Sequence, residues 1–298
     1  MKKTLVTGAT GFLGKYIVND LSEKAIISSL SRTSGDYKFS LEFQIPEFNE
    51  SFDIVIHNAG KAHIVPKTIE EEQAFFQVNV QGTQNLLYGI ERSGILPNSF
   101  IFISSVAVYG IDQGESINEN SPLLAKDPYG LSKIKAEQLV IDWCNKNNVV
   151  CTILRLPLLV GVNPPGNLGA MIKGIQKGYY FNIVGGQARK SMVLANDVAR
   201  ILLKVAEIGG IYNLTDGFHP NFYELSNAIA KQNRKTNPFN LPFFIAKTIA
   251  LLGDFIGAKF PLDSNKLNKI TSDLTFEDTK ARKVLEWKPN NVLDYYKK

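Results

Sequence analysis

Three side chains have the chemistry to move a proton at a carbonyl or hydroxyl oxygen: Ser105, Tyr129 and Lys133. The tyrosine and the lysine are four residues apart at the start of a helical pattern, so they lie on one helix face. A phenol has an ordinary pKa of about 10 and donates its proton readily in a reduction. In an oxidation it needs nearby positive charge, which the Lys133 ammonium supplies in part. Ser105 ends an apolar strand candidate and can hydrogen-bond the same oxygen.

The segment VTGATGFLGKY predicts a dinucleotide-binding turn between a strand and a helix. Its three glycines permit a tight turn and a close backbone approach, and the helix N-terminus presents free N–H groups to a pyrophosphate. A P-loop is excluded, because Ala9 stands in place of its first glycine and Tyr16 in place of its metal-binding Ser or Thr. The residues expected beside the cofactor are Gly8, Thr10, Gly11, Phe12, Leu13 and Gly14.

The residues after the second strand candidate indicate which dinucleotide binds. NAD enzymes usually place an acid there for the ribose hydroxyls, whereas NADP enzymes place an arginine near the 2′-phosphate. Here Ser31 and Arg32 stand at that point, and Asp36 follows four residues later. Because arginine binds phosphate through strong charge-assisted hydrogen bonds, NADP is favoured, with NAD as the alternative.

The elements that must position these residues alternate along the first half of the chain. Apolar strand candidates at 4–7, 25–30, 54–57, 100–104 and 149–154 are separated by helical patterns at 12–22, 70–92 and 129–145. This order predicts an α/β fold with a doubly wound parallel sheet (Rossmann), whose ligands lie at the carboxyl ends of the strands. After a break rich in proline and glycine, we expect a smaller C-terminal substrate-binding lobe. The predicted domains are 1–160 and 161–298, with 191–205 returning to the main sheet.

The amino-acid composition limits the classes of molecule that this protein is expected to bind. The net charge of +5 comes from basic residues that appear scattered among acids, which suits a small anionic ligand and argues against nucleic acid. The apolar stretch 241–257 is too short and too charged for an integral membrane segment. Its stripe of large apolar residues predicts core or a lobe interface, with contact to a membrane surface as the less favoured alternative: Phe243, Phe244, Ile245, Ile249, Leu251 and Leu252.

Two cysteines, Cys144 and Cys151, have no metal or redox spacing, and the N-terminus leaves no room for a signal peptide, so we expect a cytoplasmic protein. The histidines His57, His63 and His219 lack metal-ligand spacing, and no metal site is predicted. We expect His57 to order the turn after its strand. A serine hydrolase is excluded by the absence of a G-x-S-x-G motif.

Taken together, these motifs resemble the extended short-chain dehydrogenase/reductase family of nucleotide-sugar epimerases, dehydratases and ketoreductases. The resemblance covers nearly the whole chain and rests on TGATGFLG, DIVIHNAG, FQVNVQGTQNLL, SSVAVYG, YGLSK and DTKARKVLEWKP, the last with Glu286 where the family has glycine. Further stretches are most similar to enzymes of bacterial surface-polysaccharide synthesis that act on UDP-N-acetylhexosamines. The resemblance implies a UDP-sugar substrate and a homodimer formed by the helices after Glu70 and Tyr129.

The resemblance also implies roles for individual residues. Lys133 would bond the nicotinamide ribose, and hydride would move to or from a sugar carbon beside Tyr129. The dehydratases place two acids where this chain has Val106 and Ala107, so dehydration is excluded. Further cofactor contacts are expected from Asn58, Ala59, Gly60, Lys61, Asn79, Ser104 and Leu156, besides Ser31, Arg32, Tyr129 and Lys133. The expected substrate contacts are Ser105, Val106, Ala107, Tyr129, Asn167, Leu168 and Lys190, with Lys190 at the position of a diphosphate-binding arginine.

Three functions are compatible with this pattern. An NADPH-dependent 4-ketoreductase of a nucleotide-diphosphate sugar is favoured, because Arg32 indicates a cofactor that is exchanged in every cycle. A 4-epimerase with retained NAD is the alternative. A protein that senses NADP without chemistry is the most distant, since it has no need to combine Ser105, Tyr129 and Lys133.

Overall fold

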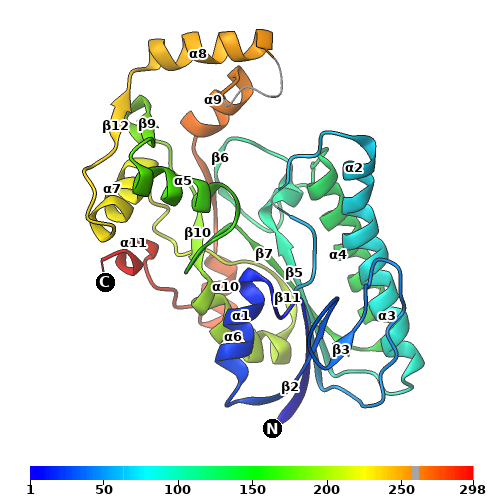
Figure 1. The fold of residues 1–298 in the computed structure, drawn as a ribbon. Coiled ribbons are helices and arrows are strands. Elements are labelled where there is room, and N and C mark those ends of the chain that lie inside the picture. Colours follow the sequence, from blue (N-terminus) through cyan, green and yellow to red (C-terminus); the bar gives the residue numbers. More distant parts are fainter. Residues whose placement is uncertain (63, 257–261, 298) are drawn as a thin grey trace.

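A computed structural model describes residues 1–62, 64–256 and 262–297. Seven strands form one sheet in the order β11-β7-β5-β4-β1-β2-β3, and every neighbouring pair is parallel (Figure 1). The strands are β1 (Lys2–Thr7), β2 (Ala25–Ser31), β3 (Tyr37–Lys38), β4 (Ile54–His57), β5 (Ser99–Ser105), β7 (Val150–Leu156) and β11 (Gly210–Asn213). The chain reverses its direction of travel across the sheet between β1 and β4, so the predicted doubly wound fold is confirmed.

Helices cover both faces of the sheet. On one face α1 (Phe12–Leu21), α6 (Ala195–Ile208) and α10 (Thr279–Leu285) pack over residues such as Val6, Ile101 and Leu154. The other face is covered by α3 (Gly82–Arg92) and α4 (Pro128–Asn147), which enclose Val55 and Phe100. Because both faces are buried, the central strands read as continuous apolar runs instead of alternating ones.

A second, smaller group of elements has its own apolar core, built around Leu168, Met171 and Leu225. It contains three parallel strand pairs, β8 with β10, β9 with β12, and β6 with β13. Its strands are β6 (Gly114–Ile117), β8 (Leu158–Val160), β9 (Phe181–Ile183), β10 (Met192–Leu194), β12 (Phe239–Leu241) and β13 (Leu274–Phe276). Its helices are α5 (Gly166–Lys177), α7 (Phe222–Gln232), α8 (Phe243–Ile256), α9 (Ser264–Thr271) and α11 (Val292–Tyr295).

The strand and the helix of segment 191–205 belong to different groups, although the sequence pattern assigned both to the main sheet. Its strand, β10, pairs with β8 outside the main sheet, whereas its helix, α6, packs on the main sheet beside α1. The strand that joins the main sheet is β11, which follows that helix and pairs with β7. The expectation that the strand at 191–205 belongs to the main sheet is therefore wrong. A three-residue strand carries too little pattern to specify its partner.

The predicted helix at 70–92 is divided in three. It consists of α2 (Ile69–Phe76), a π-helical turn over Gln77–Gln81, and α3. A π turn inserts an extra residue into the helical ladder and is often found at functional sites. Here it holds the buried Asn79, whose side chain bonds the loop after β4 instead of pointing into solvent.

Helix α8 contradicts the expectation that its apolar stripe is core. It buries the small residues Ala246, Ala250 and Gly253, whereas Phe244 and Leu252 are 69% and 54% exposed. Figure 1 shows α8 in orange at the edge of the molecule, beside α9. Within the part of the chain that is described, no helix is long and apolar enough to cross a membrane.

A buried polar cluster joins strands β5, β7 and β11 of the main sheet to α4. Arg155 in β7 and Glu137 in α4 form an ion pair of 2.7 Å with side chains 4% and 2% exposed. Glu137 also accepts a hydrogen bond of 2.5 Å from Ser104 Oγ, and Arg155 donates to Tyr109 Oη at 3.2 Å. The Tyr109 hydroxyl in turn donates to Asn213 Oδ1 at 2.8 Å. Each buried charge therefore has a partner, which is the condition for keeping it in a core.

Replacing Arg155 by methionine removes one half of this pair. The Glu137 carboxylate then stays buried without its cation, and we expect the free energy of unfolding to fall by about 3–5 kcal/mol in urea denaturation. The matched control is Lys2→Met, which breaks the exposed pair with Glu207 and should leave the free energy of unfolding nearly unchanged. Equal stability of the two variants would contradict a structural role of the buried pair.

Candidate active site

The turn after β1 is shaped for close approach of a ligand. Gly8 has φ +66°, and a Cβ there would lie 2.8 Å from Ala59 Cα; a Cβ on Gly14 would lie 2.1 Å from Gly8 O. Asn58 Nδ2 donates to Gly8 O at 3.1 Å, so the loop after β4 fixes this turn. Gly11 is the N-cap of α1 and has no side-chain cap, which leaves the first N–H groups of the helix open to an anion. Helix α1 extends over ten residues, and this cradle fits a dinucleotide pyrophosphate.

The same turn holds the other three residues predicted from the glycine motif. Thr10 is exposed, Phe12 is half-buried at the start of α1, and Leu13 is buried in the core under the helix. The Phe12 ring packs edge-on against Tyr16, 5.5 Å between centroids. The tyrosine hydroxyl accepts from Val162 N at 2.6 Å, which connects α1 to the start of the second lobe.

At the end of β2, the charged groups of Arg32 and Asp36 differ in whether they are free to bind a ligand. The Arg32 side chain is 72% exposed and stands 3.8 Å from Glu42 Oε1, while Ser31 Oγ bonds the backbone of Ser34. The Asp36 carboxylate accepts from both the backbone N–H and the hydroxyl of Ser29, each at 2.8 Å, and these bonds lower its pKa. Asp36 is therefore directed at its own loop, and Arg32 is the charged side chain open to a ligand here.

His57 orders the turn after β4, as its position predicts. Its Nδ1 is 2.7 Å from Thr7 Oγ1 and its Nε2 is 2.9 Å from Thr83 Oγ1, and Thr7 Oγ1 also accepts from Ala59 N at 3.0 Å. Burial and the Lys133 charge lower the histidine pKa to about 3, so the ring is neutral at physiological pH. No cluster of three metal-binding side chains occurs within residues 1–62, 64–256 and 262–297, and His63 lies outside them.

Asn79 connects the loop after β4 to the helix that carries Tyr129. Its Oδ1 accepts from Lys61 N at 2.7 Å, and its Nδ2 donates to Lys61 O at 3.1 Å and to Ser132 Oγ at 2.9 Å. Ser132 Oγ donates to Tyr129 O at 2.7 Å. A Cβ on Gly60 would lie 3.1 Å from Asn79 Oδ1, so the loop packs directly on this amide.

Ser105 and Tyr129 meet at the carboxyl end of β5. Asp127 caps α4 by accepting from Gly130 N at 3.0 Å, and this cap places the tyrosine in the first turn of the helix. Burial raises the pKa of the phenol, the Asp127 charge adds to this, and a hydrogen bond with Ser105 opposes it. Ser105 Oγ also accepts from Ala107 N at 3.2 Å. The phenol therefore keeps its proton at neutral pH, beside a second hydroxyl.

Lys133 is buried one helical turn after Tyr129. Its ammonium donates to Ile103 O at 2.9 Å and lies 4.6 Å from the centre of the Phe102 ring. A Cβ on Gly60 would be 3.4 Å from this ammonium, so the lysine faces the loop after β4. Burial lowers its pKa to about 8, and the Glu137 carboxylate opposes that shift.

Two other expected cofactor contacts are buried in the sheet. The Ser104 hydroxyl donates to Glu137 and so points away from the strand ends. Leu156 is 4% exposed at the end of β7, within the core under α1 and α6. Direct contact of these two side chains with a cofactor stays a prediction.

The expected substrate residues lie in two places. Val106 and Ala107 are half-buried in a 3-10 turn, Val106–Tyr109, that follows Ser105 directly. Asn167 is exposed in the first turn of α5, whereas Leu168 is buried in the core of the second lobe. The Lys190 ammonium donates to Lys269 O and Ser272 O at 3.0 and 2.9 Å, at the carboxyl end of α9. A diphosphate contact would require it to leave these carbonyls.

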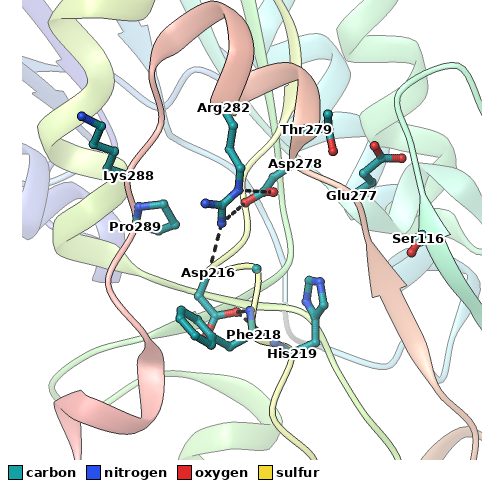
Figure 2. Close-up of a pocket in the computed structure, with 11 residues that line it drawn as sticks. Ser116, Asp216, Phe218, His219, Glu277, Asp278, Thr279, Arg282, Lys288 and Pro289 are labelled. Carbon is teal, nitrogen blue, oxygen red and sulfur yellow. Dashed lines mark hydrogen bonds and ion pairs between the residues drawn. The ribbon is translucent and has the colours of Figure 1, made fainter.

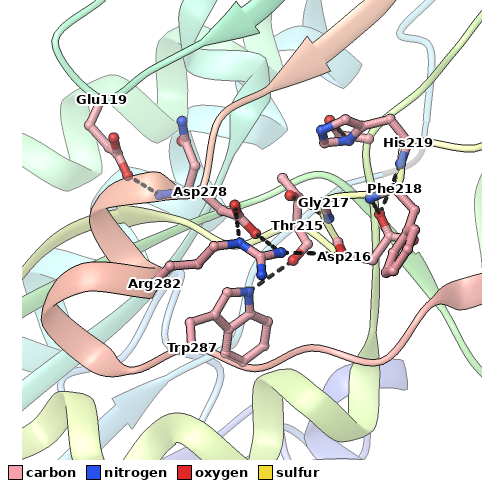
Figure 3. Close-up of polar contacts among 11 residues, drawn as sticks. Glu119, Thr215, Asp216, Gly217, Phe218, His219, Asp278, Arg282 and Trp287 are labelled. Atoms are coloured by element: carbon pink, nitrogen blue, oxygen red, sulfur yellow. Dashed lines mark hydrogen bonds and ion pairs between the residues drawn. The ribbon is translucent and has the colours of Figure 1, made fainter.

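A cavity of about 520 Å³ lies between α10 and the loop after β11 (Figure 2). Arg282 points across it from α10 and pairs with Asp278 at 2.7 Å. Figure 3 shows that the same arginine reaches Asp216 O and that Trp287 Nε1 donates to Thr215 O at 2.9 Å. The DTKARKVLEWKP motif therefore ties the C-terminal segment to the end of β11.

The chain matches the model of the NAD dependent epimerase/dehydratase family over residues 4–215. It belongs to this family. The match spans the glycine turn, the loop after β4 and the Tyr129–Lys133 helix, so the protein is an NAD(P)-dependent enzyme of the nucleotide-sugar epimerase/dehydratase type.

Two curated relatives match nearly end to end. The N-acetyl-α-D-glucosaminyl-diphospho-ditrans,octacis-undecaprenol 4-epimerase of Escherichia coli O157:H7 is 26% identical, with 93% of this chain and 88% of the relative covered. The UDP-glucose 4-epimerase of Vibrio cholerae is also 26% identical, over 98% and 92%.

Solved structures share the fold. RMD from Pseudomonas aeruginosa complexed with NADPH has a TM-score of 0.75 at 21% identity, over 99% of this chain and 97% of that one. The Thermus thermophilus UDP-glucose 4-epimerase complex with NAD has a TM-score of 0.73 at 21% identity, over 99% of both chains.

The position of Lys133 predicts a pH dependence. The ammonium loses its charge as the pH rises through about 8, while the Tyr129 phenol, whose pKa is raised, remains a proton donor. If turnover needs the ammonium, kcat/KM falls by about tenfold per pH unit above that point. Lys135→Met, on the exposed side of the same helix, should leave the profile unchanged. A profile flat to about pH 10, the ordinary range of a lysine, would contradict this role.

Proposed function

We propose that this chain is an NADPH-dependent reductase that converts the 4-keto group of a nucleotide-diphosphate sugar into a hydroxyl. The observation that carries the proposal is the half-buried Tyr129, whose phenol has a raised pKa and holds its proton at neutral pH beside Ser105. A reduction needs a proton donor of this kind, and it needs no base at the start of the cycle.

Each side chain has a defined part in this reaction. When bound, the reduced nicotinamide supplies the hydride that adds to the sugar carbon. Tyr129 gives its proton to the carbonyl oxygen as the carbon–oxygen π pair moves there, which leaves a phenolate. Ser105 hydrogen-bonds the same oxygen and stabilises the charge that develops on it. Lys133 holds positive charge beside the loop after β4, close to Gly60, and favours the phenolate until a solvent proton replaces the one transferred.

Arg32 supports NADPH over NADH. Its guanidinium is exposed at the end of β2, where the 2′-phosphate of the adenosine ribose is expected, and the nearest acid in the same loop, Asp36, is bound to Ser29. A bidentate guanidinium–phosphate contact at this point distinguishes the two cofactors. The pyrophosphate itself is assigned to the N-terminus of α1.

The substrate class follows from the family and from the named relatives. Both of the 4-epimerases act, by their names, at carbon 4 of a sugar on a diphosphate group. In this chain the diphosphate is assigned to the first turn of α5, at Asn167, whose N–H groups suit an anion. We assign residues 1–160, apart from β6 and β8, together with α6, β11 and α10, to the cofactor domain, because these elements build the main sheet and its cover. The remaining elements form the substrate lobe.

A 4-epimerase is the second candidate, and the names of these two relatives favour it. An epimerase takes a hydride from carbon 4 and returns it to the opposite face, so it must retain its cofactor. Tyr129 would then act first as a base and needs its pKa lowered in the complex, for which a bound cation is required. The same three side chains serve both reactions, and the cofactor's fate distinguishes them.

Turnover tests the proposal directly. Purified protein mixed with NADPH and a UDP-4-keto-sugar should consume NADPH and form the 4-hydroxy sugar in equal amounts. Tyr129→Phe keeps the packing of the ring against Phe75 but removes the proton donor, and should lower kcat by about 10²–10⁴-fold. Tightly held NAD(H) in the denatured protein, with interconversion of C4 epimers and no net NADPH loss, would establish the epimerase instead.

Cofactor choice is tested separately at Arg32. Arg32→Met should raise KM for NADPH by about 10- to 100-fold, the effect of losing one charged hydrogen-bonded contact, and leave KM for NADH unchanged. Lys38→Met, which removes an exposed cation in β3, is the matched control and should change neither constant. Equal effects of Arg32→Met on both cofactors would assign Arg32 a role outside 2′-phosphate binding.

A further inference from the structure

Helix α8 buries its small residues and exposes its large apolar ones. A helix on the surface of a globular protein turns its large apolar residues to the core, whereas α8 turns its small ones inward. Ala246 and Ala250 are fully buried, in a small cluster with Leu262 and Leu267. The large apolar residues of α8 that are exposed are Phe243, Phe244, Ile245, Leu251, Leu252, Phe255 and Ile256.

The exposed residues form one continuous surface. Phe244, Leu251 and Phe255 follow each other at seven and four positions, so they line the side of α8 opposite its packed face. Phe255 is 91% exposed. The surface continues onto the strand before the helix, where Phe239 pairs in register with Phe181, both exposed. Contiguous exposed apolar area of this kind marks a site of contact with another molecule or with a membrane.

The charge of the protein is concentrated in the same segment. Residues 231–270 contain seven of the 33 Lys and Arg residues but only two of the 28 Asp and Glu residues. This segment therefore carries the whole net charge of +5, and the rest of the chain is balanced. The expectation that the basic residues are scattered holds outside this segment and fails within it.

The charged residues on α8 itself lie beside the apolar side. Lys247 is exposed at one edge of it. The Asp254 carboxylate accepts from Ser264 N at 2.9 Å and from Ser264 Oγ at 2.5 Å, so it caps α9 and is turned away from the apolar surface. An apolar helix face with a cation at its edge, in a chain segment of net positive charge, is the composition of a helix that lies in a membrane interface.

We propose that α8 docks the protein on the surface of a bilayer that contains anionic lipid. Phe244, Leu251 and Phe255 enter the boundary between headgroups and acyl chains, and Lys247 at the edge of the helix faces the negative headgroups. A second copy of the chain fits this face less well. A symmetric dimer would place the same surface on itself and bring two segments of charge +5 together. The proposal is independent of which sugar reaction the enzyme performs.

Vesicle binding by the full-length protein tests this. The protein should sediment with vesicles that contain about one-third phosphatidylglycerol in phosphatidylcholine, less with pure phosphatidylcholine, and less again as salt is raised. Phe244→Ser/Phe255→Ser should lower the bound fraction at least about tenfold. Both residues are largely exposed, so circular dichroism and NADPH affinity should stay unchanged.

The matched control is Phe43→Ser, which removes a phenylalanine that is 76% exposed in another part of the molecule and should leave vesicle binding intact. Failure of the wild-type protein to bind anionic vesicles at low salt would overturn the proposal. So would equal binding of the double variant. A dimer in light scattering that dissociates in the double variant, without any vesicle binding, would assign the face to a second copy of the chain.

Discussion

The buried ion pair between Glu137 and Arg155 is the constraint on which the rest of the site depends. One carboxylate on α4 accepts from Arg155 in β7 and from Ser104 in β5, so it fixes the helix across two strands. Lys133 lies one turn earlier on the same helix, and Tyr129 one turn before that. The depth and rotation of α4, which decide where the phenol and the ammonium point, are therefore set by charge pairing in the core. Apolar packing alone would tolerate small rotations of the helix.

The same pair explains the state of Lys133. Burial lowers its pKa to about 8, and the Glu137 carboxylate keeps it from falling further. Without that carboxylate the lysine would lose its charge nearer to neutral pH, where the reaction must run. The arginine in turn keeps the carboxylate satisfied and reaches Tyr109, whose hydroxyl bonds Asn213 in the edge strand β11. Catalytic charge and the attachment of the last strand are thus parts of one buried network.

Sequence patterns predicted the parts of this site whose cause is local. Gly8 and Gly14 are required by a turn that leaves no room for a Cβ, and Tyr129 and Lys133 share a face because they are four residues apart. The pairing of Glu137 with Arg155, and the π turn that directs Asn79 to Lys61, depend on contacts between distant segments. No periodicity encodes them. Periodicity also does not tell whether an apolar helix face is covered by the rest of the protein. The large apolar residues of α8 recur at helical spacing, but they are exposed.

The protonation state of the Tyr129 phenol bears on which of the two reactions the site performs. Burial and the Asp127 charge raise its pKa, and the Ser105 hydrogen bond lowers it. This balance suits a group that begins the cycle protonated, as a reductase requires. An epimerase needs the opposite state at its first step, so it must obtain the additional lowering from positive charge that is present in the site before the hydride moves. It must also retain its cofactor, because the same hydride is returned to the sugar. The exposed Arg32 contributes to the same choice, because a reductase must exchange its cofactor after each turnover.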